Sequence, residues 1–238
     1  MLENKKLFQH GTLGALMAGL YEGTLSIQEL LTHGDMGIGT MDGLDGELII
    51  LDGVAYQGKS DGSFKKLNGN ELVPYAAVTQ FKAERLQLIN EELSANEVKN
   101  LLEKKLSSKN VFSGIRVGGT FKQVRVRNMP KQDKPYPRLI EVSEIQPEYQ
   151  EKDITGTIVG FYTPSLFQGA AAAGFHMHFI SEARDFGGHV LDFVLAEGSI
   201  EVETIETLEQ HFPTHNASFM EAEFDDANLH AEIEAAEG

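Results

Sequence analysis

The chain has 238 residues, of which 41% are hydrophobic and 24% charged, enough apolar material for one large or two small folded domains. Its formal net charge of −16 makes nucleic acids and anionic membranes poor partners, because both are negatively charged. There is no cysteine, which excludes thiolate ligands and leaves any metal to histidines and carboxylates. No stretch approaches the ~20 apolar residues of a membrane span and no clear leader is visible, so we expect a cytoplasmic protein.

Capping signals predict two helices in the first half of the chain. Ser26 and Glu29 form a capping box at the start of a short helix. Ser94 and Glu97 form a second one before a longer helix that is expected to reach Lys105, because its apolar residues repeat at helical spacing.

The segment between these helices is typical of antiparallel strands. Asp52 and Gly53 separate apolar runs at 47–51 and 54–57, and an Asp-Gly pair in this setting is a strong signal for a two-residue hairpin. Alternating apolar residues over 78–89 predict one further strand.

A second β-rich segment follows the longer helix. Residues 111–126 contain Gly118 and Gly119, and we interpret them as strand, turn, strand. Residues 128–137 are rich in proline and basic residues and interrupt the pattern, which favours a domain boundary a little further along, near residue 148.

The strongest chemical signal is the spacing of His176, His178 and His189. Side chains alternate along a strand, so His176 and His178 point to the same face. Residues 181–188 suit a hairpin loop, and if His178 lies opposite His189 across it, all three share that face. Three imidazoles that converge and leave one position open are the arrangement of a catalytic zinc site, with uncoordinated surface histidines as the alternative.

These patterns together predict an α+β fold in two subdomains, built on mixed or antiparallel sheets with a few short helices. The first, residues 1–148, is β-rich with helices. The second, residues 149–238, carries the metal site on the strands of the C-terminal sheet and ends in an acidic, weakly helical tail.

Two other interpretations start from the same histidines. Glu182 completes a His-x-His-x3-Glu pattern like the first motif of cupins, which would make the chain a metal- or ligand-binding domain, but no second cupin motif follows. Another mononuclear zinc enzyme, such as a hydrolase, would need an activated water, and no Asp-rich second metal motif is visible.

Three segments carry a resemblance to a known family: LFQHGTLGALMAGLYEG, GIGTMDGLDGELIILDGVAYQ and GFHMHFISEARDFGGHVLDF, which lie at residues 7–23, 37–57 and 174–193. Taken together they resemble acetolactate decarboxylase, and the resemblance extends over nearly the whole chain. It implies that His176, His178 and His189 are the Zn²⁺ ligands. The other site residues that it implies carry a hydroxyl or a charge: Thr40, which lines the site, and the catalytic Glu47, Arg127 and Glu237, the last with Glu234 as the alternative.

The resemblance implies decarboxylation of 2-acetolactate (2-hydroxy-2-methyl-3-oxobutanoate) to acetoin and CO₂. In our hypothesis zinc acts as a Lewis acid and stabilises the enediolate that forms as CO₂ leaves. Arg127 binds the carboxylate of this small acid substrate, and Glu47 or Glu237 delivers the proton. The resemblance also implies a homodimer.

Overall fold

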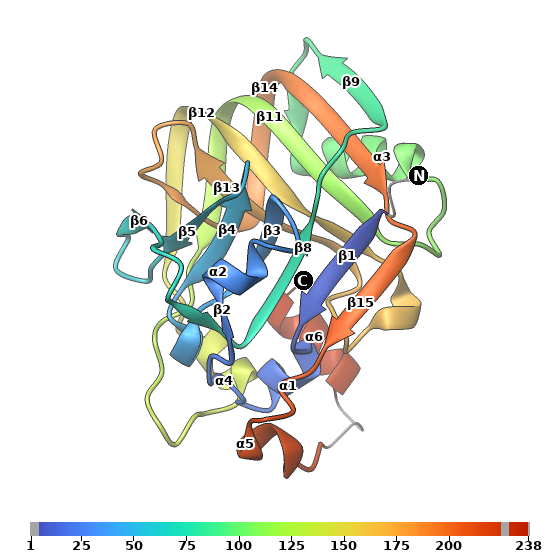
Figure 1. Cartoon of the computed structure of the whole chain (residues 1–238). Coiled ribbons are helices and arrows are strands. Elements are labelled where there is room, and N and C mark those ends of the chain that lie inside the picture. The colour runs from blue at the N-terminus through green and yellow to red at the C-terminus, as the bar shows by residue number, and fades with distance from the viewer. Residues whose placement is uncertain (1–4, 225–228, 238) are drawn as a thin grey trace.

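The structure, a computed structural model, describes residues 5–224 and 229–237, except for the side chains of His230, Glu234 and Glu237. Two β-sheets lie face to face, and most of the short helices gather at one end of them (Figure 1). The fold is therefore mostly β, with mixed and antiparallel pairing and a few short helices, as the sequence predicts. No described helix is long and apolar enough to cross a membrane.

The first sheet has seven strands in the order β15-β1-β8-β3-β4-β5-β6. Its strands are β1 (Lys6–His10), β3 (Met36–Thr40), β4 (Glu47–Leu51), β5 (Val54–Gly58), β6 (Phe64–Lys66), β8 (Tyr75–Thr79) and β15 (Thr207–His211). All neighbours are antiparallel except β1 and β15, which run parallel, so a late segment of the chain returns to the edge beside its first strand.

The second sheet is antiparallel throughout. Its strands are β9 (Arg85–Ile89), β10 (Leu93–Ser94), β11 (Ser113–Arg127), β12 (Glu148–Thr163), β13 (Gly174–Ser181) and β14 (Gly187–Thr204). Because β13 pairs with both β12 and β14, the strands β11 to β14 close on themselves at one end. A separate small pair consists of β2 (Leu25–Ser26) and β7 (Leu72–Val73).

The helices are short and lie mainly below the sheets in Figure 1. They are α1 (Leu13–Met17), α2 (Ile27–Leu30), α3 (Ala95–Lys105), α4 (Leu139–Ser143), α5 (Ala217–Met220) and α6 (Leu229–Glu237), with 3-10 turns at η1 (Asp42–Leu44) and η2 (Ser165–Phe167). Helix α3 packs on the second sheet, whereas α1, α4 and α6 contact one another. Their apolar side chains form a core cluster together with residues outside these helices, among them Tyr75 of β8 and Leu44 of η1.

Several local predictions are confirmed. Helix α3 begins after Ser94, and both hydrogen bonds of its capping box with Glu97 are present. Ser26 likewise caps α2. Strands β4 and β5 form the predicted hairpin, and both turn residues adopt a positive φ, 51° at Asp52 and 73° at Gly53, as a two-residue hairpin requires.

Two strand predictions are wrong. Residues 78–89 are the end of β8 and the whole of β9, which belong to different sheets. The chain crosses between the sheets at residues 80–84, and alternation of apolar residues does not reveal such a crossing. Gly118 and Gly119 lie inside the single strand β11 and form no turn. At Gly119 a Cβ atom would lie 2.1 Å from the carbonyl oxygen of Glu197, so glycine is needed for the close approach of β14.

The predicted boundary near residue 148 falls at the start of β12, which pairs along its length with β11. The second sheet takes β9, β10 and β11 from before this point and β12, β13 and β14 from after it. The division into subdomains 1–148 and 149–238 therefore stays a prediction, and the two sheets are the units that position the site.

Candidate metal centre and active site

Three histidines converge at the closed end of the second sheet. His176 and His178 lie two apart on β13, and His178 is directly opposite His189 on β14, the pairing that the sequence predicts. The three ring centroids are 4.8 to 5.4 Å apart. One ligand nitrogen from each ring lies within 4.8 Å of the other two, so this group could hold one metal ion.

The tautomer of His178 is set by the other sheet. Its Nδ1 lies 2.9 Å from the carbonyl oxygen of Leu48 on β4, so Nδ1 carries the proton and donates it. The lone pair is therefore on Nε2, which is buried and has no hydrogen-bond partner among the described residues. A buried acceptor of this kind, oriented by a hydrogen bond on its other nitrogen, is what a metal-binding imidazole requires. The residues present thus fit a metal ion.

The electrostatics of the site keep the imidazoles neutral. Burial lowers the pKa of His176 to about 3, and the nearby charge of Arg127 acts in the same direction. Burial likewise lowers the pKa of His178 and of His189 well below the usual histidine value. Since the neutral ring is the form that binds a metal, all three are ready for coordination at pH 7.

Arg127 brings a positive charge to the histidines. It is the last residue of β11, its partner in the ladder is His189, and it is only 3% exposed. Its Nη1 donates to Oε1 of Gln146 over 2.9 Å, and its Nη2 lies 3.3 Å from Nε2 of His189. A buried guanidinium at this place is suited to bind a carboxylate.

The first sheet contributes Thr40 and Glu47, which face each other across the β3–β4 pair and are 4% and 6% exposed. The hydroxyl of Thr40 donates to the carbonyl oxygen of Gly46 over 2.7 Å. An Oε2 of Glu47 lies 3.5 Å from Nε2 of His178. A carboxylate and a hydroxyl from one sheet thus meet the histidines and the arginine of the other.

These residues line one small pocket, which encloses about 370 Å³ of space between atoms, part of it open to solvent. All the predicted site residues whose side chains the structure describes are among its lining residues: Thr40, Glu47, Arg127, His176, His178 and His189. The remaining wall is almost entirely apolar: Leu13, Leu16, Leu44, Tyr75, Met129 and Leu139, together with Gly39. An apolar wall with a few convergent polar groups is typical of a small-molecule site.

Glu237 and its alternative Glu234 belong to α6, but their side chains lie outside the described part of the chain. The helix itself packs against α1 and α4, next to the pocket. Ile233 and Ala236 are buried in the core cluster that α6 shares with α1 and α4, the helices that carry three leucines of the pocket wall. A role for either glutamate in the site stays a prediction.

Sequence reasoning missed the wall residue Tyr75 and the anchor Gln146. Tyr75 faces Thr40 across the β3–β8 pair, so correct strand pairing would have found it. No local signal marks Gln146. Glu182, the residue behind the cupin interpretation, is not part of the metal-binding group found among the described residues.

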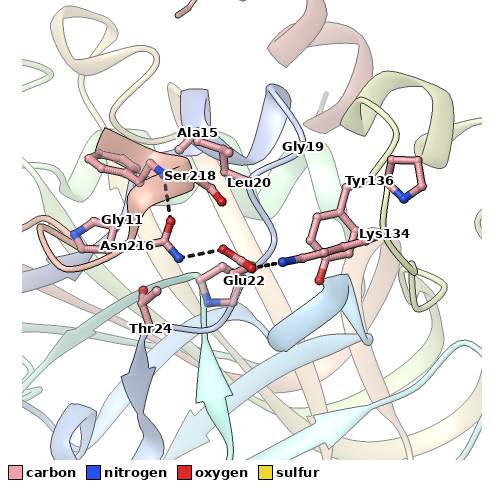
Figure 2. Close-up of a pocket in the computed structure, with 14 residues that line it drawn as sticks. Gly11, Ala15, Gly19, Leu20, Glu22, Thr24, Lys134, Tyr136, Asn216 and Ser218 are labelled. Carbon is pink, nitrogen blue, oxygen red and sulfur yellow. Dashed lines mark hydrogen bonds and ion pairs between the residues drawn. The ribbon is translucent and has the colours of Figure 1, made fainter. Parts of the chain in front are cut away.

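A second pocket is lined by Ala15 of α1 and by Glu22, Lys134 and Asn216 among others (Figure 2). Glu22 accepts hydrogen bonds from Lys134 and from Asn216, the latter over 2.7 Å. None of the predicted site residues whose side chains the structure describes lines this pocket. The chemistry is therefore concentrated in the histidine pocket.

Comparison with known proteins gives the family of the chain. The sequence profile of the alpha-acetolactate decarboxylase family matches residues 7–226. The chain is 47% identical over 237 residues to the alpha-acetolactate decarboxylase of Lactococcus lactis subsp. cremoris, with both chains covered completely. The chain belongs to the alpha-acetolactate decarboxylase family. It is also 45% identical to the enzyme of that name from Streptococcus thermophilus, again over the whole of both chains.

Solved structures share the fold. The alpha-acetolactate decarboxylase of Bacillus subtilis strain 168 superposes with a TM-score of 0.95 at 34% identity, over 98% of this chain and 99% of that one. A Staphylococcus aureus protein described as similar to alpha-acetolactate decarboxylase also has a TM-score of 0.95, at 48% identity. Family membership makes the chain an enzyme and supports decarboxylation of acetolactate as its activity.

Proposed function

We propose that the chain converts 2-acetolactate to acetoin and CO₂ with a zinc ion held by His176, His178 and His189. The observation that carries the proposal is the meeting of three converging imidazoles with Arg127 and Glu47 in one pocket. When bound, the ion supplies Lewis acidity toward the oxygens of the substrate. Nitrogen ligands alone do not distinguish zinc from its neighbours among the transition metals, so the identity of the metal is part of the proposal.

Arg127 binds the carboxylate of the substrate. In a chain with a net charge of −16 an anion is repelled at long range, so a local cation is needed to capture it. The planar guanidinium can donate two parallel hydrogen bonds to a carboxylate. Its position beside His189 supports a carboxylate site next to the histidines.

The reaction consumes one proton, and an acidic residue of the pocket donates it. When CO₂ leaves, the electron pair of the broken carbon–carbon bond passes toward the ketone oxygen. The carbon that carried the carboxylate then takes up one proton. Glu47 is buried in the pocket and within 3.5 Å of His178, so it is one candidate donor. Glu237 is the other. Delivery from one side only would give acetoin of a single configuration.

The hydroxyl of Thr40 and the apolar wall orient the substrate. Thr40 lies across the strand pair from Glu47 and can accept a hydrogen bond while it donates to Gly46. The leucines and Met129 displace water and lower the local dielectric, which strengthens each charged contact in the pocket.

The test measures acetoin released from racemic acetolactate by purified protein, with a chelator-stripped sample as the baseline. The proposal expects release well above the baseline and its recovery when zinc is added back. No release by zinc-loaded protein would favour another mononuclear zinc enzyme or a binding domain. The homodimer implied by the resemblance and the cytoplasmic location expected from the sequence remain predictions.

A further inference from the structure

A neutral amide holds the guanidinium of Arg127 at the edge of the pocket. Oε1 of Gln146 accepts a hydrogen bond of 2.9 Å from Nη1, while Nη2 lies 3.3 Å from His189. The two terminal nitrogens are thus directed to different sides, one toward the loop and one toward the histidines. Since Arg127 is 3% exposed, these two contacts contribute to the direction in which its planar group faces.

The backbone positions Gln146 beside Arg127. It lies in the connection between α4 and β12, two residues before Glu148, the ladder partner of Arg127. The N–H of Asn128 donates to the carbonyl oxygen of Pro147 over 3.3 Å. The end of β11 is therefore bonded to this connection twice, through a side chain and through the backbone. Two contacts on adjacent residues hold the amide in register with the guanidinium.

The chemistry of the side chain matters as much as its place. An amide oxygen accepts a hydrogen bond without a formal charge, so Gln146 itself adds no negative charge beside Arg127. A carboxylate at residue 146 would form a charge-assisted bond with the same nitrogen and reduce that attraction. Gln146 is not among the residues that line the pocket, so any effect on the substrate passes through Arg127.

We propose that Gln146 is a positioning residue, which aims the guanidinium of Arg127 at the carboxylate of the substrate and adds no negative charge beside it. The inference rests on the proposed function, because it takes the carboxylate of acetolactate as the ligand of Arg127. It adds a residue for which no role has been predicted, and it explains why a neutral acceptor stands beside the buried cation.

The test compares Gln146→Glu and Gln146→Ala with the control Gln150→Glu. Gln150 lies four residues further along, on an exposed part of β12, so the control introduces the same charge without contacting Arg127. Two quantities are measured on zinc-loaded protein: KM and kcat for acetolactate, and the Kd of 2-hydroxy-2-methylpropanoate by calorimetry. This probe has the hydroxy acid group of the substrate and does not decarboxylate. Zinc content and Tm are recorded for each variant.

We expect Gln146→Glu to raise both KM and the Kd of the probe by about tenfold or more, and Gln146→Ala to raise them less. The change in kcat should be smaller, and zinc content and Tm should stay close to wild type. Lowering the pH from about 7.5 to 5 should reduce the penalty of Gln146→Glu, because the introduced carboxyl takes up a proton. A purely structural role predicts the opposite order, since glutamate has the shape of glutamine and alanine does not.

Wild-type affinity for the probe in both Gln146 variants, with wild-type KM, would overturn the inference. So would an effect of Gln150→Glu as large as that of Gln146→Glu. Failure of the proposed function has a different signature: the wild-type chain itself would release no acetoin. In that case the Kd of the probe still tests the positioning of Arg127. A Kd raised by Gln146→Glu but not by the control Gln150→Glu supports it, and an unchanged Kd contradicts it.

Discussion

His178 on the second sheet donates a hydrogen bond of 2.9 Å to the carbonyl oxygen of Leu48 on the first. The two residues are 130 positions apart in the chain, so this bond forms only when the sheets pack. It holds the proton on Nδ1 and turns Nε2 toward the pocket, where Glu47 lies 3.5 Å away. The packing of the two sheets therefore sets the orientation of the His178 ring.

Metal binding should stabilise the whole fold, because the ligands come together only in the folded chain. With free zinc at about a thousand times its Kd, the linkage adds about 4 kcal/mol, which raises the Tm of a chain of this size by about 8 °C or more. Differential scanning calorimetry of stripped and zinc-restored protein measures this shift. Equal Tm values at saturating zinc would show that the histidine group binds no metal.

Replacing His176 with alanine should remove metal and activity together. One of three ligands is lost, and we expect zinc content to fall and kcat/KM to drop by about 100-fold or more. His215→Ala is the matched control, since His215 is exposed and lies outside the pocket. Retention of zinc and turnover in the His176 variant would remove this residue from the ligand set.

Arg127→Lys should impair capture of the substrate even though it conserves the charge. A lysine cannot reproduce the two parallel hydrogen bonds of a guanidinium, and we expect kcat/KM to fall by about 10- to 100-fold. The same change at Arg125, two residues back on β11 and 45% exposed at its side chain, should leave kcat/KM near wild type. A wild-type rate for Arg127→Lys would mean that another group holds the carboxylate.

The role of the C-terminal glutamates is best tested by point substitution. Truncation at residue 231 would also delete Ile233 and Ala236, which are 1% and 2% exposed, and loss of the isoleucine packing alone costs about 2–5 kcal/mol. Glu237→Gln and Glu234→Gln avoid this loss. We expect Glu237→Gln to retain zinc and Tm but lower kcat by about 100-fold or more, whereas Glu234→Gln stays active. The reverse pattern would transfer the role to Glu234.

A buried acid away from the pocket should make stability depend on pH. Burial raises the pKa of Glu203 to about 7, with Asp35 acting in the same direction, against Lys5 and the hydrogen bonds from Lys82 and Thr79. Between pH 4.5 and 7 the folded form then keeps a proton that the unfolded chain has released. This contribution to stability is complete below pH 4.5 and is lost as the pH rises to 7, at a cost of up to about 3 kcal/mol.

Urea unfolding of wild type and Glu203→Gln at pH 5 and pH 7.5 measures this contribution. The substitution should flatten the pH dependence and stabilise the chain at the higher pH, because an amide cannot ionise. Glu197→Gln, on an exposed part of the same strand, should leave the dependence unchanged. If the wild-type and Glu203→Gln profiles run parallel, Glu203 is not the titrating group.

Local sequence determined the elements whose signals are complete within a few residues. The Ser94–Glu97 capping box, the N-cap at Ser26 and the Asp52–Gly53 hairpin appear as predicted, because their hydrogen bonds and φ values involve near neighbours. The period of two along a strand places His176 and His178 on one face. A short hairpin then brings His189 opposite His178, so the convergence of the three histidines follows from the sequence without any knowledge of distant packing.

Only the tertiary structure decided what surrounds that group. Thr40 and Glu47 come from the other sheet, Arg127 reaches His189 along the β11–β14 ladder, and the apolar wall comes largely from helices at one end of the molecule. These contacts depend on how twisted sheets pack face to face, and hydrophobic periodicity carries no information about which strands belong to which sheet. For the same reason residues 78–89 were predicted as one strand, although the chain passes there from one sheet to the other.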